Sequence, residues 1–289
     1  MRVIIAPDSF KGSATATEVA TAIAEGWVSA RPGDDVRLMP MADGGEGTLD
    51  AFEVAVPGAT RMPVTVTGPD DRPVDTHWLL LPPTDATPGA TGVIELACTS
   101  GLTLLDPLRP LEAHTIGFGQ AIAAALDHGV TRLLLAIGGS SSTDGGAGAL
   151  SALGARFLDA KGQEVRPGGG DLTRVTSADL SALRPVPAGG ALVLSDVTNP
   201  LLGVLGAPSV FGPQKGADAS DLEILERALA ALAVVLPADA DTAGAGAAGG
   251  TGFGLLAWGA QMAPGAAADS SAMPVERSSS SIRITDWRR

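Results

Sequence analysis

The chain has 289 residues, enough for one large domain or two ordinary ones, and 45% of them are hydrophobic, although only 3% are aromatic. Its formal net charge of −13 argues against a polyanionic partner, because nucleic-acid binding needs a basic face. One cysteine excludes an intrachain disulfide and cysteine-rich zinc sites. The apolar runs are too short for a signal peptide or a membrane span, so we expect a cytoplasmic protein with no membrane partner. The oligomeric state stays open, a homo-oligomer included.

The first 56 residues have the pattern strand, loop and helix twice. Residues 2–7 form a short β-branched run, and Thr15 and Glu18 after it have the spacing of a helix capping box. A second strand at 35–40 leads through a glycine-rich turn into a helix from about Thr48 to Ala55. This alternation predicts an α/β fold with a doubly wound parallel sheet.

Residues 61–81 change character, because two β-rich runs flank a Gly-Pro-Asp-Asp turn and predict a hairpin. Farther along, periodicity predicts alternating strands and helices, with strands at 93–96, 132–137 and from 191, and helices at 116–128, 146–154 and 221–236.

Polar, glycine-bearing segments follow four of the predicted strands: APDSFKGS (6–13), PMADGGEGT (40–48), AIGGSSSTDGG (136–146) and LSDVTNP (194–200). In open α/β sheets, ligands bind beyond the carboxyl ends of the strands. We therefore expect a single site assembled from all four segments.

The segment from 138 to 146 has the composition of an anion cradle. Consecutive glycines let several backbone N–H groups face one point, and the N-terminus of the following helix adds a positive dipole. The sequence lacks the Gly-Lys-Ser/Thr ending of a Walker A loop. Asp144 is expected either near a metal or as the cap of the helix. The predicted nucleotide contacts are Gly138, Gly139, Ser140, Ser141, Ser142 and Asp144.

The other segments offer charged groups in a chain that has only three lysines. Lys11 suits a transferring phosphoryl group or a substrate carboxylate, with Asp8 beside it, although both could form an exposed ion pair. Asp43, with Glu46 near it, supplies the oxygen ligands that Mg²⁺ prefers, although Glu46 could simply start a helix. Lys215 is a second loop lysine that is equally plausible as a ligand or as a structural residue.

Asp196 and Asn199 come directly after a buried run. The carboxylate could accept the proton of a substrate hydroxyl, and the amide could hold the metal or the substrate; an Asx turn before Pro200 is the alternative. Gly244, Gly246 and Gly249 match the spacing of a dinucleotide fingerprint, but no strand is predicted before them. A packing turn or a helix-leading anion site is therefore favoured over a dinucleotide-dependent oxidoreductase.

The segments named above, together with FGPQKGA (211–217) and GAGAAGGTGFGLLA (244–257), stand in the order seen in bacterial glycerate kinases, and the chain resembles that family from residue 1 to about 265. The resemblance implies an enzyme that uses ATP and Mg²⁺ to phosphorylate D-glycerate, usually at the 2-hydroxyl. The matching motifs contain Asp8, Lys11, Asp43, Gly138 to Ser142, Asp144, Asp196 and Asn199. From the chemistry of the residues we expect catalytic roles for Asp8, Lys11, Asp196 and Asn199, nucleotide contacts from the 138–144 segment and Lys215, and a metal at Asp43 and Asp144.

The resemblance also implies a second α/β domain inserted into the first. We place the first, Rossmann-like domain at 1–60 and 240–268, the inserted domain at 61–239 and an irregular tail at 269–289. Family members continue with motifs that this chain does not have after about residue 265. The sequence therefore raises the alternative of a truncated, catalytically impaired remnant that at most binds nucleotide or glycerate.

Overall fold

The computed structural model describes residues 1–263, except residues 9, 11–12, 43 and 86. Its centre is a six-stranded sheet in the order β10-β9-β6-β5-β4-β3. Four strands run parallel, and a hairpin joined antiparallel to β5 completes the sheet. The parallel strands are β10 (Gln261–Ala263), β9 (Ala191–Leu194), β6 (Arg132–Ala136) and β5 (Thr91–Glu95), and the hairpin is β4 (Pro73–Leu81) with β3 (Thr60–Thr67). The predicted α/β class and the predicted hairpin are confirmed.

Helices cover both faces of this sheet, which is why its parallel strands are apolar without alternation. Successive side chains of a strand point to opposite faces. Leu133 and Leu135 of β6 therefore join the larger hydrophobic cluster, with α4 (Ile116–His128) and α8 (Thr251–Trp258), whereas Leu134 joins a smaller cluster with α2 (Thr48–Ala55). The helices predicted at 48–55 and 116–128 are confirmed.

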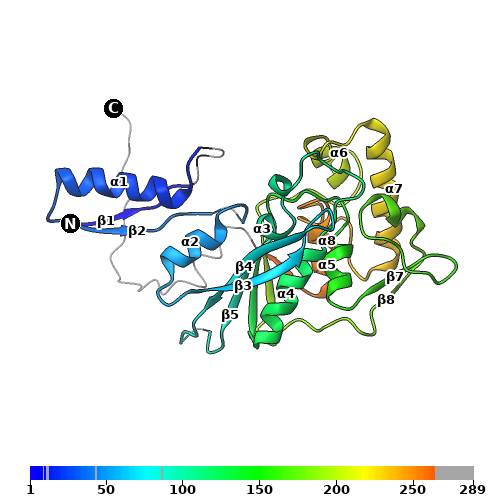
Figure 1. Ribbon diagram of the computed structural model, residues 1–289, viewed down its shortest axis with the longest axis horizontal. Helices are drawn as coiled ribbons and strands as arrows, with labels where there is room; N and C mark the ends of the chain where they lie inside the picture. The colour runs from blue at the N-terminus through cyan, green and yellow to red at the C-terminus, as the bar shows by residue number, and fades with distance from the viewer. Residues whose placement is uncertain (9, 11–12, 43, 86, 264–289) are drawn as a thin grey trace.

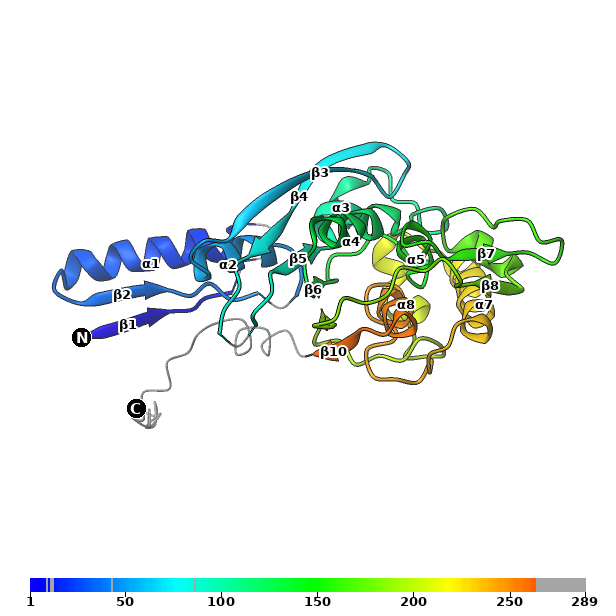
Figure 2. The same cartoon turned by 90° about the horizontal axis from the view of Figure 1, so that it is seen from below.

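A small unit precedes the six-stranded sheet and extends from one end of the molecule (Figures 1 and 2). It consists of the parallel pair β1 (Arg2–Ile5) and β2 (Asp35–Leu38) with α1 (Ala16–Ala30) packed against them. The predicted capping box starts α1: Glu18 N donates to Thr15 Oγ1 at 3.1 Å, and Thr15 N donates to Glu18 Oε2 at 2.8 Å. These two strands form a sheet of their own.

Residues 240–263, which were predicted to share a domain with residues 1–60, pack on the six-stranded unit. β10 pairs with β9, and α8 buries Phe253 in the larger hydrophobic cluster of the six-stranded unit. α2 likewise packs on the six-stranded sheet, through Leu49 and Phe52. The division into two domains stays a prediction, and residues 264–289 lie outside the described part.

The remaining elements lie mostly at the far end of the six-stranded unit. They are α3 (Ala97–Ser100), η1 (Leu102–Leu104), α5 (Ala147–Ala152), β7 (Arg156–Leu158), η2 (Gly170–Arg174), β8 (Ser177–Asp179), α6 (Ala207–Phe211), η3 (Pro213–Lys215) and α7 (Ala219–Val235). Asp218 caps α7, the clearest amphipathic helix of the sequence, by accepting from Asp221 N at 3.0 Å.

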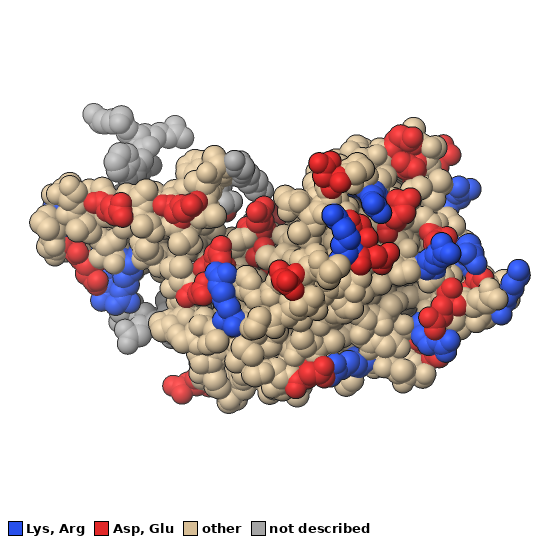
Figure 3. Space-filling model, viewed as in Figure 1, with Lys and Arg blue, Asp and Glu red and all other residues tan. Residues whose placement is uncertain are grey.

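On the face shown in Figure 3, basic side chains are interspersed with acidic ones. Within the described residues, none of the helices has the length and apolar character needed to cross a membrane.

Candidate functional site

Main-chain contacts bring three of the four predicted strand-end segments together. Gly138 N donates to Gly44 O at 2.8 Å, which joins the end of β6 to the loop before α2. Gly44 has a φ of +88°, and a Cβ there would lie 2.3 Å from the carbonyl oxygen of Leu194, the last residue of β9. The loop at 44–47 is therefore clamped against the carboxyl ends of two neighbouring parallel strands.

The fourth segment reaches the same edge through the small unit. Met41 N donates to Pro7 O at 2.9 Å, so the chain leaving β1 runs beside the chain that leads into the loop at 44–47. Asp8, Glu46 and Asp196 are exposed at the ends of these segments. Lys11 and Asp43, which were predicted as a catalytic and a metal-binding residue, lie outside the described residues.

Asn199 is held within its own turn. Its side-chain Nδ2 donates to Leu205 O at 2.8 Å, and its carbonyl oxygen accepts from Gly246 N at 2.9 Å. This geometry fixes the chain after Asp196. The substrate or metal contact predicted for Asn199 stays a prediction.

The serines of the 138–144 segment point into the protein. Ser140, Ser141 and Ser142 are 6%, 1% and 0% exposed. The Ser141 hydroxyl donates to Ser100 O at 2.8 Å, and the Ser140 hydroxyl donates to Ala248 O at 3.2 Å. These hydroxyls shape the loop, whereas Gly139, with a φ of +74°, lies exposed at its start. The nucleotide contacts predicted for Gly138 to Ser142 stay a prediction.

Asp144 is fully buried and serves as the hub of the loop. Oδ2 accepts from Thr115 N at 2.9 Å, Thr115 Oγ1 at 2.7 Å and Gly148 N at 3.2 Å, and Oδ1 accepts from Ser142 Oγ and Gly146 N, both at 3.2 Å. Five donors use the acceptor capacity of one carboxylate. This geometry favours the helix-capping alternative for Asp144 over metal binding, so both its metal role and its nucleotide contact stay predictions.

Lys215 is buried beside the same loop and is 2% exposed. Its ammonium donates to Ser142 O, and it also lies 3.4 Å from Ser140 Oγ. Burial lowers the pKa of Lys215 to about 7, although the nearby Asp144 carboxylate opposes that shift. Lys215 therefore supports the loop from behind, and its predicted nucleotide contact stays a prediction.

The glycines at 244–250 pack against this loop as well. Gly145 N donates to Gly249 O at 3.1 Å, and a Cβ on Gly249, whose φ is +68°, would lie 2.1 Å from Ser142 O. Residues 239–250 are all described and form turns, with α8 following them. The packing turn considered from the sequence is therefore present, and the alternative of a helix-leading anion site stays a prediction.

Glu95, at the carboxyl end of β5, is a buried acid that the sequence analysis missed. Its Oε2 accepts from Leu49 N at 3.0 Å, and its Oε1 accepts from Gly47 N at 3.3 Å and from the Cys98 thiol at 3.2 Å. Burial raises the pKa of the Glu95 carboxyl and also the pKa of the Cys98 thiol. A carboxylate inside the apolar run VIEL was the available signal.

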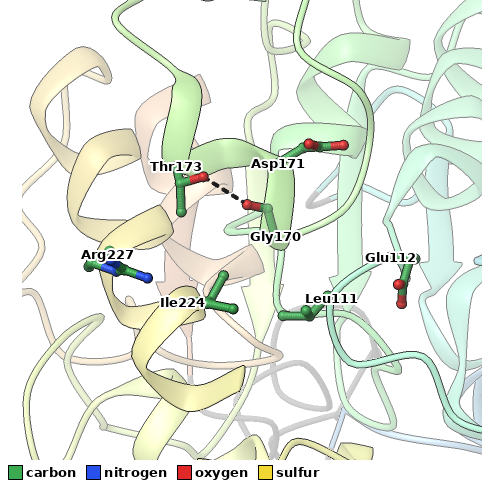
Figure 4. Close-up of a pocket in the computed structure, with 7 residues that line it drawn as sticks. All are labelled: Leu111, Glu112, Gly170, Asp171, Thr173, Ile224 and Arg227. Carbon is green, nitrogen blue, oxygen red and sulfur yellow. Dashed lines mark hydrogen bonds between the residues drawn. The ribbon is translucent and has the colours of Figure 1, made fainter. Parts of the chain in front are cut away.

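The structure also contains a pocket of about 560 Å³ (Figure 4). None of the predicted site residues that the structure describes lines it. Thr173 Oγ1 donates to Gly170 O at 3.0 Å in its wall, and Arg227 of α7 faces into the same space. Its walls are formed by Leu111, Glu112, Gly170, Asp171, Thr173, Ile224 and Arg227.

A magnesium ion would find oxygen ligands at the strand ends. Glu46 and Asp196 are exposed carboxylates, and Mg²⁺ in proteins usually takes one or two such groups together with substrate phosphates. Among the described residues there is no group of three or more His, Cys, Asp and Glu side chains that could hold a metal ion.

Comparison with known proteins identifies the family. The sequence profile of the glycerate kinase family matches residues 3–283. The chain is 46% identical to the glycerate kinase of Bacillus subtilis over 266 residues, which cover 89% of this chain and 68% of that protein. It is 42% identical to the glycerate 2-kinase of Escherichia coli over 274 residues, covering 92% and 70% of the two chains.

A solved structure agrees with these sequence relatives. The crystal structure of a protein assigned as glycerate kinase 2 from Salmonella typhimurium LT2 has a TM-score of 0.84 and 41% identity, and the match covers 94% of this chain and 74% of that one. The chain therefore belongs to the glycerate kinase family and is a kinase, that is, a phosphotransferase.

Proposed function

We propose that this protein transfers the terminal phosphoryl group of ATP to the 2-hydroxyl of D-glycerate. The observation that carries the proposal is the convergence of the 138–139 segment, the loop at 44–47 and the end of β9. The names of the relatives supply the substrate, because they are glycerate kinases and one of them is a glycerate 2-kinase.

Phosphoryl transfer depends mainly on positioning and electrostatic stabilisation, so the chain has to hold two anions close together. Asp196, exposed after β9, would accept the proton of the attacking hydroxyl, and Asn199 would fix the turn that carries it. Asp8 and Lys11 belong to the segment that follows β1 in the sequence, and the ammonium of Lys11 would offset phosphate charge.

The start of the 138–144 segment would provide backbone contacts to the nucleotide phosphates, supported from behind by Asp144 and Lys215. When bound with the nucleotide, Mg²⁺ would neutralise charge on the phosphates. We propose Asp43 as its protein ligand, with the exposed Glu46 on the same loop as a second oxygen donor.

The test is release of ADP from ATP in a coupled assay with D-glycerate, with the L-enantiomer as the control substrate. Phosphorus NMR of the product distinguishes 2-phosphoglycerate from 3-phosphoglycerate. We expect turnover that requires D-glycerate and Mg²⁺ and gives the 2-phosphate. A folded chain that binds Mg·ATP without releasing ADP would contradict the proposal and favour the impaired remnant considered from the sequence.

The role of Asp196 can be tested in the same assay. The substitution Asp196→Asn keeps the shape of the side chain but removes the proton acceptor, so we expect kcat to fall by about 100-fold or more. The KM values should change little, because an exposed carboxamide still fills the same space. A variant with wild-type kcat would remove Asp196 from the proposal.

A further inference from the structure

α2 begins at a point where its own sequence supplies no cap. Its N-cap residue is Gly47, which has a φ of +87° and no side chain to accept from the first helical N–H groups. Unsatisfied donors at a buried helix start are costly, so another group has to accept from them. Glu95 does this from a different element, 48 residues away along the chain from Gly47, by accepting from Gly47 N and Leu49 N.

The same few residues carry the contacts that join the site together. Three residues before Gly47, Gly44 O accepts from Gly138 N, and Gly44 lies against the Leu194 carbonyl. The loop is thus fixed at three points, to the ends of β6, β9 and β5. The first two contacts use main-chain atoms, and the third uses the side chain of Glu95.

Glu95 itself cannot reach a bound ligand, because it is 1% exposed and both of its oxygens accept hydrogen bonds from the protein. Glu46, which precedes Gly47 directly and lies three residues before Leu49, is exposed. Any effect of Glu95 on chemistry therefore has to act through the position of this loop.

We propose that Glu95 is a positioning residue for phosphoryl transfer. It fixes the position of the 44–47 loop, and therefore of Glu46, relative to the carboxyl ends of β6 and β9. The expected effect of Glu95 on catalysis rests on the proposed function, whereas its effect on the position of the loop does not. The favourable interaction of a carboxylate with a helix N-terminus makes an acid suitable for this role, since it satisfies the donors and faces the positive end of α2.

The test compares Glu95→Gln with Glu53→Gln. The first substitution is isosteric, but it replaces one acceptor oxygen by an amide group that cannot accept from a backbone N–H. The second makes the same chemical change on α2 at a surface site, where Glu53 pairs with Arg61. Kinetics with D-glycerate and Mg·ATP are measured with both variants, and amide hydrogen exchange is followed at residues 44–49.

We expect Glu95→Gln to lower kcat by about 10-fold or more, because a displacement of the order of 1 Å in a positioned group has effects of this size. KM for glycerate should stay within about two-fold, the Mg²⁺ concentration for half-maximal rate should rise, and exchange at 44–49 should accelerate. Glu53→Gln should leave all four quantities near their wild-type values.

Three results would overturn the inference: a kcat within about two-fold of wild type, a loss confined to KM, or unchanged exchange at 44–49. Failure of Glu95→Gln to fold would also overturn it, because the carboxylate would then support the core rather than the loop. If the wild-type chain shows no turnover, the proposed function fails, and the exchange comparison alone decides whether Glu95 holds the loop.

Discussion

Asp144 shows how one buried residue can organise a loop that looks, in sequence, like a ligand site. Its carboxylate joins the start of α4, through Thr115, to the start of α5, through Gly148. A buried charge of this kind is stable only because every lone pair is used. The small polar residues around Asp144 therefore hold the loop in its conformation through hydrogen bonds within the protein.

Replacing this hub should be costly. Asp144→Asn puts an amide group where backbone and hydroxyl donors converge, so we expect the free energy of unfolding to fall by about 3 kcal/mol. Urea denaturation followed by circular dichroism measures this. Asp127→Asn, at an exposed ion pair with Arg184, is the control and should leave the midpoint almost unchanged. A similar effect of the two substitutions would show that Asp144 is not a structural hub.

Lys215 gives a pH dependence with a definite sign. Its pKa is about 7 in the folded protein, below the ordinary lysine value of 10.5, so between those values the unfolded chain binds more protons than the folded one. The penalty for burying the ammonium is complete below pH 7 and is relieved as the pH rises. Relative to Lys215→Met, the wild type should gain about 1–2 kcal/mol between pH 7 and 9.

Urea midpoints of both proteins at the two pH values test this, because groups common to both cancel in the difference. Parallel changes in the two proteins would mean that Lys215 keeps an ordinary pKa. A wild type that loses stability relative to Lys215→Met over this range would show a shift in the opposite direction.

At the scale of elements, the sequence predicted the bounds of helices best, because their hydrophobic pattern repeats over more than one turn. The helices at 48–55 and 116–128 agree with the structure at both ends. β7 and β8, with three residues each, were missed because so few residues cannot show a period. The pairing of β10 with β9 was not predicted either, since strand pairing is decided by contacts distant in sequence.

The candidate site was predictable in outline for a similar reason. Parallel strands of one sheet end at the same edge, so the meeting of the loops after β6 and β9 follows from the fold class. The loop before α2 follows β2, which belongs to a separate sheet, so its contact with this edge does not follow from the same rule. The directions of the side chains did not follow. Ser141 and Lys215 point inward because their acceptors come from remote segments, and Glu95 was overlooked because its strand is otherwise apolar.

Two glycines in different elements should respond oppositely to the same substitution. Gly44→Ala forces a side chain to a positive φ and toward the Leu194 carbonyl, so we expect a loss of more than about 2 kcal/mol of stability. Gly26, in the exposed interior of α1, has no atom within 4 Å of the added Cβ. Gly26→Ala should therefore stabilise by about 0.5–1 kcal/mol.

Thermal and urea denaturation of both variants provide the comparison. A destabilising Gly26→Ala would mean that α1 is distorted at that residue. A neutral Gly44→Ala would mean that the loop can move away from β9 at little cost, and it would weaken the argument for a tightly clamped site.

At the scale of the whole molecule, the two units differ in how much they bury. Both hydrophobic clusters consist of residues from 49 onward, whereas the small unit leaves Ile4 55% and Ile23 45% exposed. Fewer buried contacts imply a lower free energy of local opening. We expect backbone amides of β1 and α1 to exchange much faster than those of β5 and β6.

Hydrogen exchange of the full chain, resolved by mass spectrometry or NMR, measures this difference. Leu134 and Leu135, in the centre of the larger sheet, provide the protected reference. Equal protection of Ile5 and Leu135 would show that the small unit opens only with the global unfolding of the protein.

The placement of α2 has a mechanical consequence. Although it follows β2 directly, α2 contributes Leu49 and Phe52 to the core of the larger unit, so residues 39–42 are the junction through which the described chain passes between the units. A rotation about that junction would leave both cores intact and make the small unit a lever: its outer end at the start of β1 would move most, while Asp8 would move little because Pro7 O accepts from Met41 N at the junction. Ligand-driven tightening of such a lever would register as a smaller radius of gyration in solution scattering.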